Sequence, residues 1–326
     1  MRRLIAGLLV LIACVGVEGC RSKEEALTAK PSDPALSGRI FATAGPGESQ
    51  SDLYEALVFS ERVALYQLTK TGRTFGVDGC DSSLTVDVAG PDVDFQDALR
   101  RFQDRTAVQI DGLGDARGAL DSVAPDCRVL YQRLDRSTTP PTGHLMVFDP
   151  AAKSVKELYA ARNPQTALGI ADWGPDGRVA LFEGTAETEG HPAVTTGIVV
   201  ISPDGSKRTL PPPVTEFGTL QWRTSKWMAV SDEANRKTVF LDPDSGARSE
   251  LAGWYPLAWS PDGQRLMVTD APTRMTLGVV DIADLTKARV IGHARKAAFF
   301  NLLWLPMNAT AGGSTLIPGQ PNDDGD

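Results

Sequence analysis

One segment of this chain reads Leu257-Ala258-Trp259-Ser260-Pro261-Asp262-Gly263-Gln264-Arg265-Leu266-Met267-Val268 and joins two apolar runs through a short polar turn. Proline fixes its own φ angle and suits the second position of a turn, while aspartate and glycine tolerate the backbone that follows. The segment therefore predicts two antiparallel strands, with Trp259 at the end of the first.

The same order of residues recurs along the chain, in good copies at 170–181 and 120–131 and weaker copies at 57–66, 220–230 and 302–306. The aligned aromatic or apolar positions are 59, 123, 173, 222, 259 and 304, spaced 37 to 64 residues apart. A third apolar strand and a fourth, more polar one follow most copies. Four strands in a repeat of about 45 residues predict an all-β chain with a single β-propeller. Six copies favour six four-stranded blades, with five or seven as alternatives.

Two further segments complete the predicted ring. Residues 38–44 (GRIFATA) look like a strand ahead of the first copy, and we expect them to return and complete the last blade. Residues 72–118 interrupt the repeat and are interpreted as an insertion. Within it, Asp94–Arg105 predicts one short helix, because Asp94 can cap its start and Phe95, Ala98, Leu99 and Phe102 share one helical face.

The motif Trp-Ser-Pro-Asp-Gly before an apolar strand resembles the repeat of TolB-like propellers, also called the PD40 or WD40-like repeat. The resemblance covers residues 38–306 and implies the propeller fold. TolB proteins carry an α/β domain before the propeller, and this chain has no room for one. We therefore carry over the fold and not the partners of that family.

The N-terminus is typical of an exported lipoprotein. Met1-Arg2-Arg3 precedes an unbroken apolar run at 4–13, which is too short to span a bilayer as a stable helix. Leu11-Ile12-Ala13-Cys14 resembles a bacterial lipobox, and Cys20 is the rival acceptor. The motif favours Cys14, whereas signal length favours Cys20. We expect a signal peptide at 1–19, a linker at 21–37, the propeller at 38–306 with its insertion, and a flexible tail at 307–326.

The remaining cysteines, Cys80 and Cys127, are 47 residues apart. Exported proteins commonly carry disulfides, so this pair is a candidate disulfide, and two separate buried thiols are the alternative. The sequence predicts no metal site and no cofactor, since no second cysteine lies near either one and the histidines, His144, His191 and His293, have no ligand spacing. No nucleophile elbow or phosphate loop is present.

Polar residues shortly before the repeat position are the candidates for a central channel: Glu55, Asp121, Asp172, Gln221 and Asn301. The formal net charge of −8, without a lysine or arginine cluster, argues against a nucleic-acid partner. We therefore favour a non-catalytic envelope lipoprotein, facing the periplasm or the exterior, that binds a protein or a small ligand. The alternative is a lactonase-like propeller hydrolase with a divalent metal held by the channel residues.

Overall fold

The computed structural model describes residues 36–309 apart from short internal gaps, the longest of which are 89–97, 114–118, 138–141 and 187–192. The predicted signal peptide, Cys14 and Cys20, and nearly all of the linker and tail lie outside the described residues. Twenty-four strands make up the regular structure that is described, so the chain is all-β. Among these residues, no helix has the length and apolar character to cross a bilayer.

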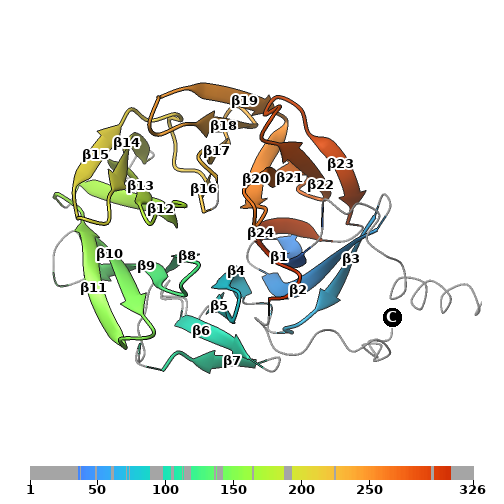
Figure 1. Cartoon of the computed structure of the whole chain (residues 1–326), viewed down its shortest axis with the longest axis horizontal. Helices are drawn as coiled ribbons and strands as arrows, with labels where there is room; N and C mark the ends of the chain where they lie inside the picture. Colours follow the sequence, from blue (N-terminus) through green and yellow to red (C-terminus); the bar gives the residue numbers. More distant parts are fainter. Residues whose placement is uncertain are drawn as a thin grey trace, which may run out of the picture.

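The strands form sheets, antiparallel except for one pair, that are arranged as a ring (Figure 1). One sheet contains β4 (Thr74–Cys80), β5 (Ser83–Val88), β6 (Ala98–Gln103) and β7 (Thr106–Gln109). The next contains β8 (Ala119–Val123), β9 (Val129–Asp135), β10 (Thr142–Asp149) and β11 (Ser154–Ala160). A third contains β12 (Thr166–Trp173), β13 (Val179–Thr185), β14 (Val194–Ile201) and β15 (Lys207–Leu210). A fourth contains β16 (Leu220–Gln221), β17 (Met228–Asp232), β18 (Lys237–Leu241) and β19 (Arg248–Ala252).

The last sheet has eight strands in two halves. The first half is β20 (Trp254–Trp259), β21 (Arg265–Asp270), β22 (Thr276–Asp281) and β23 (Arg289–His293). The second half is β3 (Arg62–Gln67), β2 (Gln50–Phe59), β1 (Arg39–Gly47) and β24 (Ala298–Leu305). A single parallel pair, His293 of β23 with Arg62 of β3, joins the halves at their outer strands. Counted as hydrogen-bonded sheets, the propeller therefore has five blades and not the six predicted. The spacing of repeats in the sequence cannot show that the outer strands of two neighbouring units pair with each other.

The ring closes by pairing the two ends of the described chain, as the sequence predicts. β1 lies between β24 and β2, and Phe41 pairs with Leu303 on one side and Glu55 on the other. Gly38, just before β1, allows this close approach, since an added Cβ would lie 2.4 Å from the Trp304 indole nitrogen. Closure therefore depends on residues that are far apart in sequence.

The predicted helical insertion is wrong. Ala98–Gln103 forms strand β6, paired with β5 and β7 in a regular four-stranded sheet, while Asp94 and Phe95 lie outside the described residues. Phe102 is buried beside Leu84 and Val86 of β5. A short apolar run fits a helix face and a strand face equally well, and the pairing available on both sides makes this one a strand.

The core lies between neighbouring sheets, and four repeat-position tryptophans fill it. Trp222 packs among residues of the preceding sheet that include Phe182. Trp173 and Trp259 pack in the same way against the sheets before them, and Trp304 packs against the β20–β23 half of its own eight-stranded sheet. This confirms that the repeated aromatic position serves inter-sheet packing.

The turn aspartates act as predicted. Asp126, Asp176 and Asp262 each accept a hydrogen bond from the backbone N–H two residues later. Cys127 occupies the position that is glycine in two other copies, with φ of +68° beside +78° at Gly177. The structure joins it to Cys80 in a disulfide that links the β4–β5 turn to the β8–β9 turn.

Candidate functional site in the central channel

Six innermost strands surround the channel in the order β4, β8, β12, β16, β20 and β24, each contacting its two neighbours. Between them lies a cavity of about 80 Å³. Four of the five channel residues expected from the sequence line it: Asp121, Asp172, Gln221 and Asn301. The structure thus brings together residues from β8, β12, β16 and β24.

Glu55 does not belong to this group. It lies on β2, separated from the channel by β1 and β24, and its Oε1 accepts a hydrogen bond from Arg39 Nε at 3.1 Å. Both side chains are buried, so the ion pair braces the closing sheet. The weak sequence copy at 57–66 corresponds to the outer hairpin β2–β3 and not to an innermost strand. The prediction that Glu55 lines the channel is wrong for this reason.

Irregular pairing shapes the channel wall. The innermost strand β8 has a register shift between Leu120 and Ser122, and similar shifts occur in β4, β12 and β20. An extra residue on one strand redirects its side chain and releases its backbone from the ladder. In β8 the extra residue is Asp121, which lines the cavity.

Asp172 ties three sheets together. Its carboxylate accepts a very short hydrogen bond from Ser122 Oγ of β8 and bonds from the backbone N–H groups of Trp173, Trp222 and Arg223 at 2.8, 2.6 and 3.3 Å. Burial raises the pKa of Asp172 to about 6, and the nearby Asp78 charge adds to this, whereas the hydrogen bonds oppose it. The donors around this carboxylate are therefore fixed by the fold.

An ion pair crosses the channel. Arg223 lies two residues after the end of β16 and bonds to the Asp78 carboxylate and the Gly79 carbonyl of β4. Two innermost strands separate β16 from β4 on either side of the ring. Asp78 also accepts the backbone N–H of Val123 at 2.6 Å. Both charged groups line the cavity, so the pair forms part of its wall.

Asp121 is only half satisfied. Its Oδ1 accepts bonds from Gln132 Nε2 at 3.1 Å and from the Ala171 backbone N–H at 3.2 Å. Its Oδ2 is buried without a partner among the described residues, and so is Thr219 Oγ1 on the same cavity. Burial raises the pKa of Asp121 to about 8, with the Asp172 charge adding to the effect and the two hydrogen bonds opposing it.

Sequence reasoning missed Asp78, Ser122, Thr219 and Arg223. Asp78 and Asp172 play equivalent parts, because each accepts the N–H of the residue at the repeat position of another sheet, Val123 or Trp222. Because residues 72–118 are interpreted from the sequence as an insertion, Asp78 is assigned to no repeat and this equivalence is not predicted. One feature of the sequence could have identified Arg223 as a channel residue: it directly follows Trp222, which occupies the repeat position.

The two described histidines and the other side chains that could bind a metal ion are spread over the described structure. His144 lies on β10, where its Nδ1 is 2.7 Å from Glu157 Oε2, and His293 ends β23. His191 is outside the described residues. Within the described part of the chain, no three His, Cys, Asp or Glu side chains are grouped so that they could hold a metal ion.

Fold and channel together define a single β-propeller with a narrow, polar centre. No protein-family profile and no curated protein matches the chain, so the resemblance to TolB-like propellers stays a prediction. Among solved structures, it is similar to an oligogalacturonate lyase in complex with manganese, at 16% identity and a TM-score of 0.47, over 74% of this chain and 71% of that one.

Two further solved structures are similar at the level of the fold. An oligogalacturonate lyase from Vibrio parahaemolyticus matches at 13% identity and a TM-score of 0.44, over 77% of this chain and 73% of that one. The β-propeller domain of the trilobed protease from Pyrococcus furiosus matches at 12% identity and a TM-score of 0.42, over 67% and 70%. These values concern the fold and assign no activity.

Proposed function

We propose that this chain is a non-catalytic binding protein, held at a membrane by a lipidated cysteine, whose propeller binds an envelope protein or a small ligand. The observation that carries the proposal is that two carboxylates of the channel are already bonded to groups of the protein. Asp172 accepts four hydrogen bonds from protein donors, and Asp78 is paired with Arg223. Groups committed to holding sheets together are poorly placed to change partners during a reaction.

The size of the channel supports the same proposal. A cavity of about 80 Å³ is small beside the roughly 300–1,000 Å³ of typical small-molecule sites. The ring around it is built from hydrogen-bonded strands, whereas loops on its two faces can vary without disturbing the core. Recognition on such a face, or of one small group in the channel, suits this architecture better than turnover of a bulky substrate.

The test compares purified protein in Ca²⁺, Mn²⁺ or Zn²⁺ with the same protein in a chelator, using lactone and phosphoester substrates. We expect no turnover under either condition, and recovery of a specific envelope protein by cross-linking in the host. The hydrolase alternative requires metal-dependent turnover that Asp172→Ala or Asn301→Ala abolishes. That result would replace the binding proposal.

The lipid anchor has its own experiment. Its support is the Leu11-Ile12-Ala13-Cys14 motif after a basic start and an apolar run. Radiolabelled palmitate should enter the protein in its host and disappear in either Cys14→Ser or Cys20→Ser, whichever removes the acceptor, while the other variant keeps the label. Mature protein that is unlabelled and fully soluble would contradict the anchor.

A further inference from the structure

Two residues that line the central cavity each carry a buried oxygen without a partner among the described residues, Asp121 Oδ2 from β8 and Thr219 Oγ1 just before β16. Buried polar atoms in folded proteins nearly always have a partner in the protein, in ordered water or in a ligand. The two atoms belong to different sheets, on residues that line one cavity. The cavity wall therefore holds an unpartnered carboxyl oxygen, which can accept, and an unpartnered hydroxyl, which can accept or donate.

The charge around these atoms is negative. Asp78 of β4 and Arg223 after β16 also line the cavity, but they are paired with each other. Asp172 of β12 and Asp121 are the other titratable groups on the wall, and both are carboxyls. With a pKa of about 6, Asp172 is mostly ionised at neutral pH, and Asp121 ionises as the pH rises toward 8. Once the ion pair is set aside, the cavity favours a cation that can donate hydrogen bonds.

Gln221 and Asn301 add uncharged polar groups to the wall, and its remaining residues are apolar. Leu120, Ile170 and Phe300 line the cavity from β8, β12 and β24, and all three are partly exposed. Ile170 is 39% exposed, which is unusual for a large aliphatic side chain in the middle of a folded protein. Apolar side chains that keep contact with solvent at this point provide a surface for a hydrocarbon chain.

We propose that the channel binds a primary ammonium group carried on an unbranched alkyl chain, with the ammonium at Asp121 and Thr219 and the chain against Leu120, Ile170 and Phe300. The inference rests on the proposed binding function and names the chemistry of its ligand. An ammonium group needs only acceptors and negative charge, whereas a metal ion needs a converging set of ligands that the described residues do not form. A cavity of about 80 Å³ admits the end of a narrow chain and excludes branched or bulky cations.

The same chemistry can come from a lysine side chain of a partner protein or from a free alkylamine. Both present an ammonium on a straight chain of methylenes. They are distinguished by comparing n-butylammonium with a lysine-containing peptide blocked at its N-terminus, and that peptide with its Nε-acetylated form. Tighter binding of the unmodified peptide assigns the site to a protein ligand, and equal or weaker binding assigns it to a free amine.

Calorimetric titration of the full-length protein with n-butylammonium tests the proposal, with 1-butanol as the uncharged control. We expect butylammonium to bind and butanol not to bind. Asp121→Asn keeps the shape of the side chain and an acceptor for Gln132 and Ala171 but loses the charge, so its affinity should fall at least tenfold. Thr219→Val should weaken binding severalfold. Glu157→Gln on the outer strand β11 is the matched control and should bind like the wild type.

The dependence on pH provides a second measurement. Asp121 must lose its proton to pair with an ammonium, and its pKa lies near 8. Affinity should therefore rise by up to about tenfold per pH unit from pH 6 toward pH 8 and then level off. This rise should vanish in Asp121→Asn. Of the other charged groups on the cavity, Asp172 titrates lower, near pH 6, and the Asp78–Arg223 pair is present in both proteins.

Three results would overturn the proposal: equal binding of butylammonium and butanol, unchanged affinity in both Asp121→Asn and Thr219→Val, or no binding of any amine to folded wild-type protein. The last would mean that water alone satisfies the two oxygens. A specific envelope partner recovered without amine binding would leave the proposed function standing and remove only this inference. If Asp121→Asn fails to fold, Thr219→Val and the pH profile of the wild type still decide.

Discussion

Asp121 combines an unpartnered buried oxygen with a pKa raised from 3.8 to about 8, so its proton is part of the folded state near neutral pH. In the unfolded chain the same carboxyl is ionised above pH 4. Between these two pKa values the folded protein binds a proton that the unfolded chain has lost. The stability that this group contributes is thus complete below about pH 4 and is lost as the pH rises through about 8.

The first prediction at the scale of residues follows from this direction of the change in stability with pH. The free energy of unfolding should fall between pH 5 and pH 8, by at most about 1.4 kcal/mol per pH unit from Asp121. Asp172, with its pKa of about 6, adds to the fall at the acidic end of this range. Asp121→Asn should be less sensitive to pH and more stable than the wild type at pH 8. Urea unfolding at pH 5, 6.5 and 8 measures both curves, and parallel curves for the two proteins would contradict the assignment.

Cys127 is the second residue whose local conformation makes a prediction. Its φ of +68° lies in the left-handed region that glycine tolerates, and it holds one end of the disulfide to Cys80. Cys80→Ala removes the cross-link, whose loop of 47 residues contributes on the order of 3–4 kcal/mol, together with one buried sulfur atom, and leaves the backbone at Cys127 unchanged. Cys127→Gly removes the cross-link and relieves about 1 kcal/mol of backbone strain.

Both variants should therefore be less stable than the oxidised wild type, with Cys127→Gly the more stable of the two by about 1 kcal/mol. Urea unfolding with and without a reducing agent separates the two effects. Under reducing conditions, Cys127→Gly should equal or exceed the wild type. If it is less stable than the reduced wild type, the backbone strain is not the deciding factor at this position.

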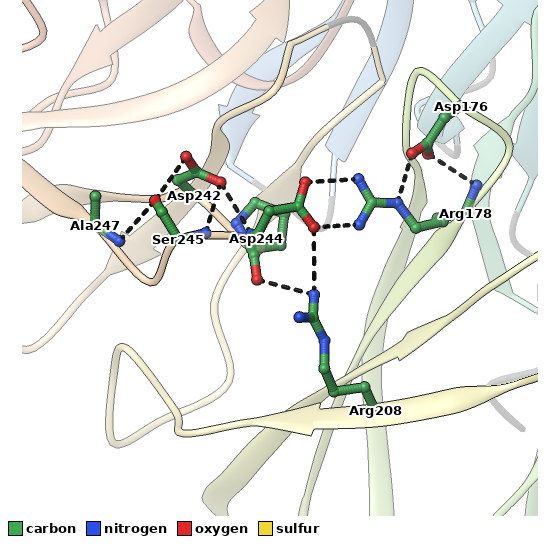
Figure 2. Close-up of polar contacts among 8 residues, drawn as sticks. Asp176, Arg178, Arg208, Asp242, Asp244, Ser245 and Ala247 are labelled. Carbon is green, nitrogen blue, oxygen red and sulfur yellow. Dashed lines mark hydrogen bonds and ion pairs between the residues drawn. The ribbon is translucent and has the colours of Figure 1, made fainter.

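At the scale of elements, the turn of one sheet is fastened to the tryptophan of the next. Arg178 lies over the Trp222 ring at 5.0 Å, and Arg128 lies over the Trp173 ring at 4.7 Å. Figure 2 shows Arg178 between Asp176 of its own turn and Asp244 of the next sheet, while Arg208 reaches Asp244 from another side. The aspartate, the arginine two residues later and the next tryptophan thus act as one inter-sheet unit.

This unit predicts different effects for the two arginines. Arg178→Met keeps the apolar stem but loses the cation over the ring and two ion pairs, so unfolding should become easier by about 1–2 kcal/mol. Arg208→Met loses a partly buried hydrogen bond to the Pro243 carbonyl and one exposed contact to Asp244, and should cost less than about 1 kcal/mol. Urea unfolding compares them directly. Equal losses in the two variants would mean that the stacking on Trp222 contributes nothing.

The elements also show why the sequence revealed some features and concealed others. The two strands of a hairpin such as β20–β21 are adjacent in sequence, so the sequence around Trp259 was sufficient to predict the strand and the turn that follows it. The sheet β4–β7 was missed because Asp81 and Ser82 stand where other copies carry a Pro-Asp turn and no aromatic marks the end of β4. In the channel, Asp121 and Asp172 were predictable as polar residues near the repeat position. The Asp78–Arg223 pair spans 145 residues and becomes visible only when the ring is closed.

For the whole molecule, closure makes the two ends of the described chain one structural unit. β1 is a central strand between β24 and β2, so its backbone hydrogen bonds hold the innermost strand β24 in place. Ala42 lies in the middle of β1, is fully buried and pairs with both Tyr54 and Leu302. Damage at this residue should therefore affect the ring as a whole.

We expect Ala42→Pro to destabilise the protein by about 3 kcal/mol or more, because proline removes a ladder hydrogen bond and clashes within a central strand. Hydrogen exchange should show β24 losing protection together with β1, although some 250 residues separate them, since neither strand can stay paired without the other. Arg248→Pro is the control: it changes the first residue of the outer strand β19, where proline is tolerated, and should leave β24 protected. Loss of protection confined to β1 in Ala42→Pro would mean that β24 is held by β4 and β20 alone, and that the ring does not depend on the pairing of its ends.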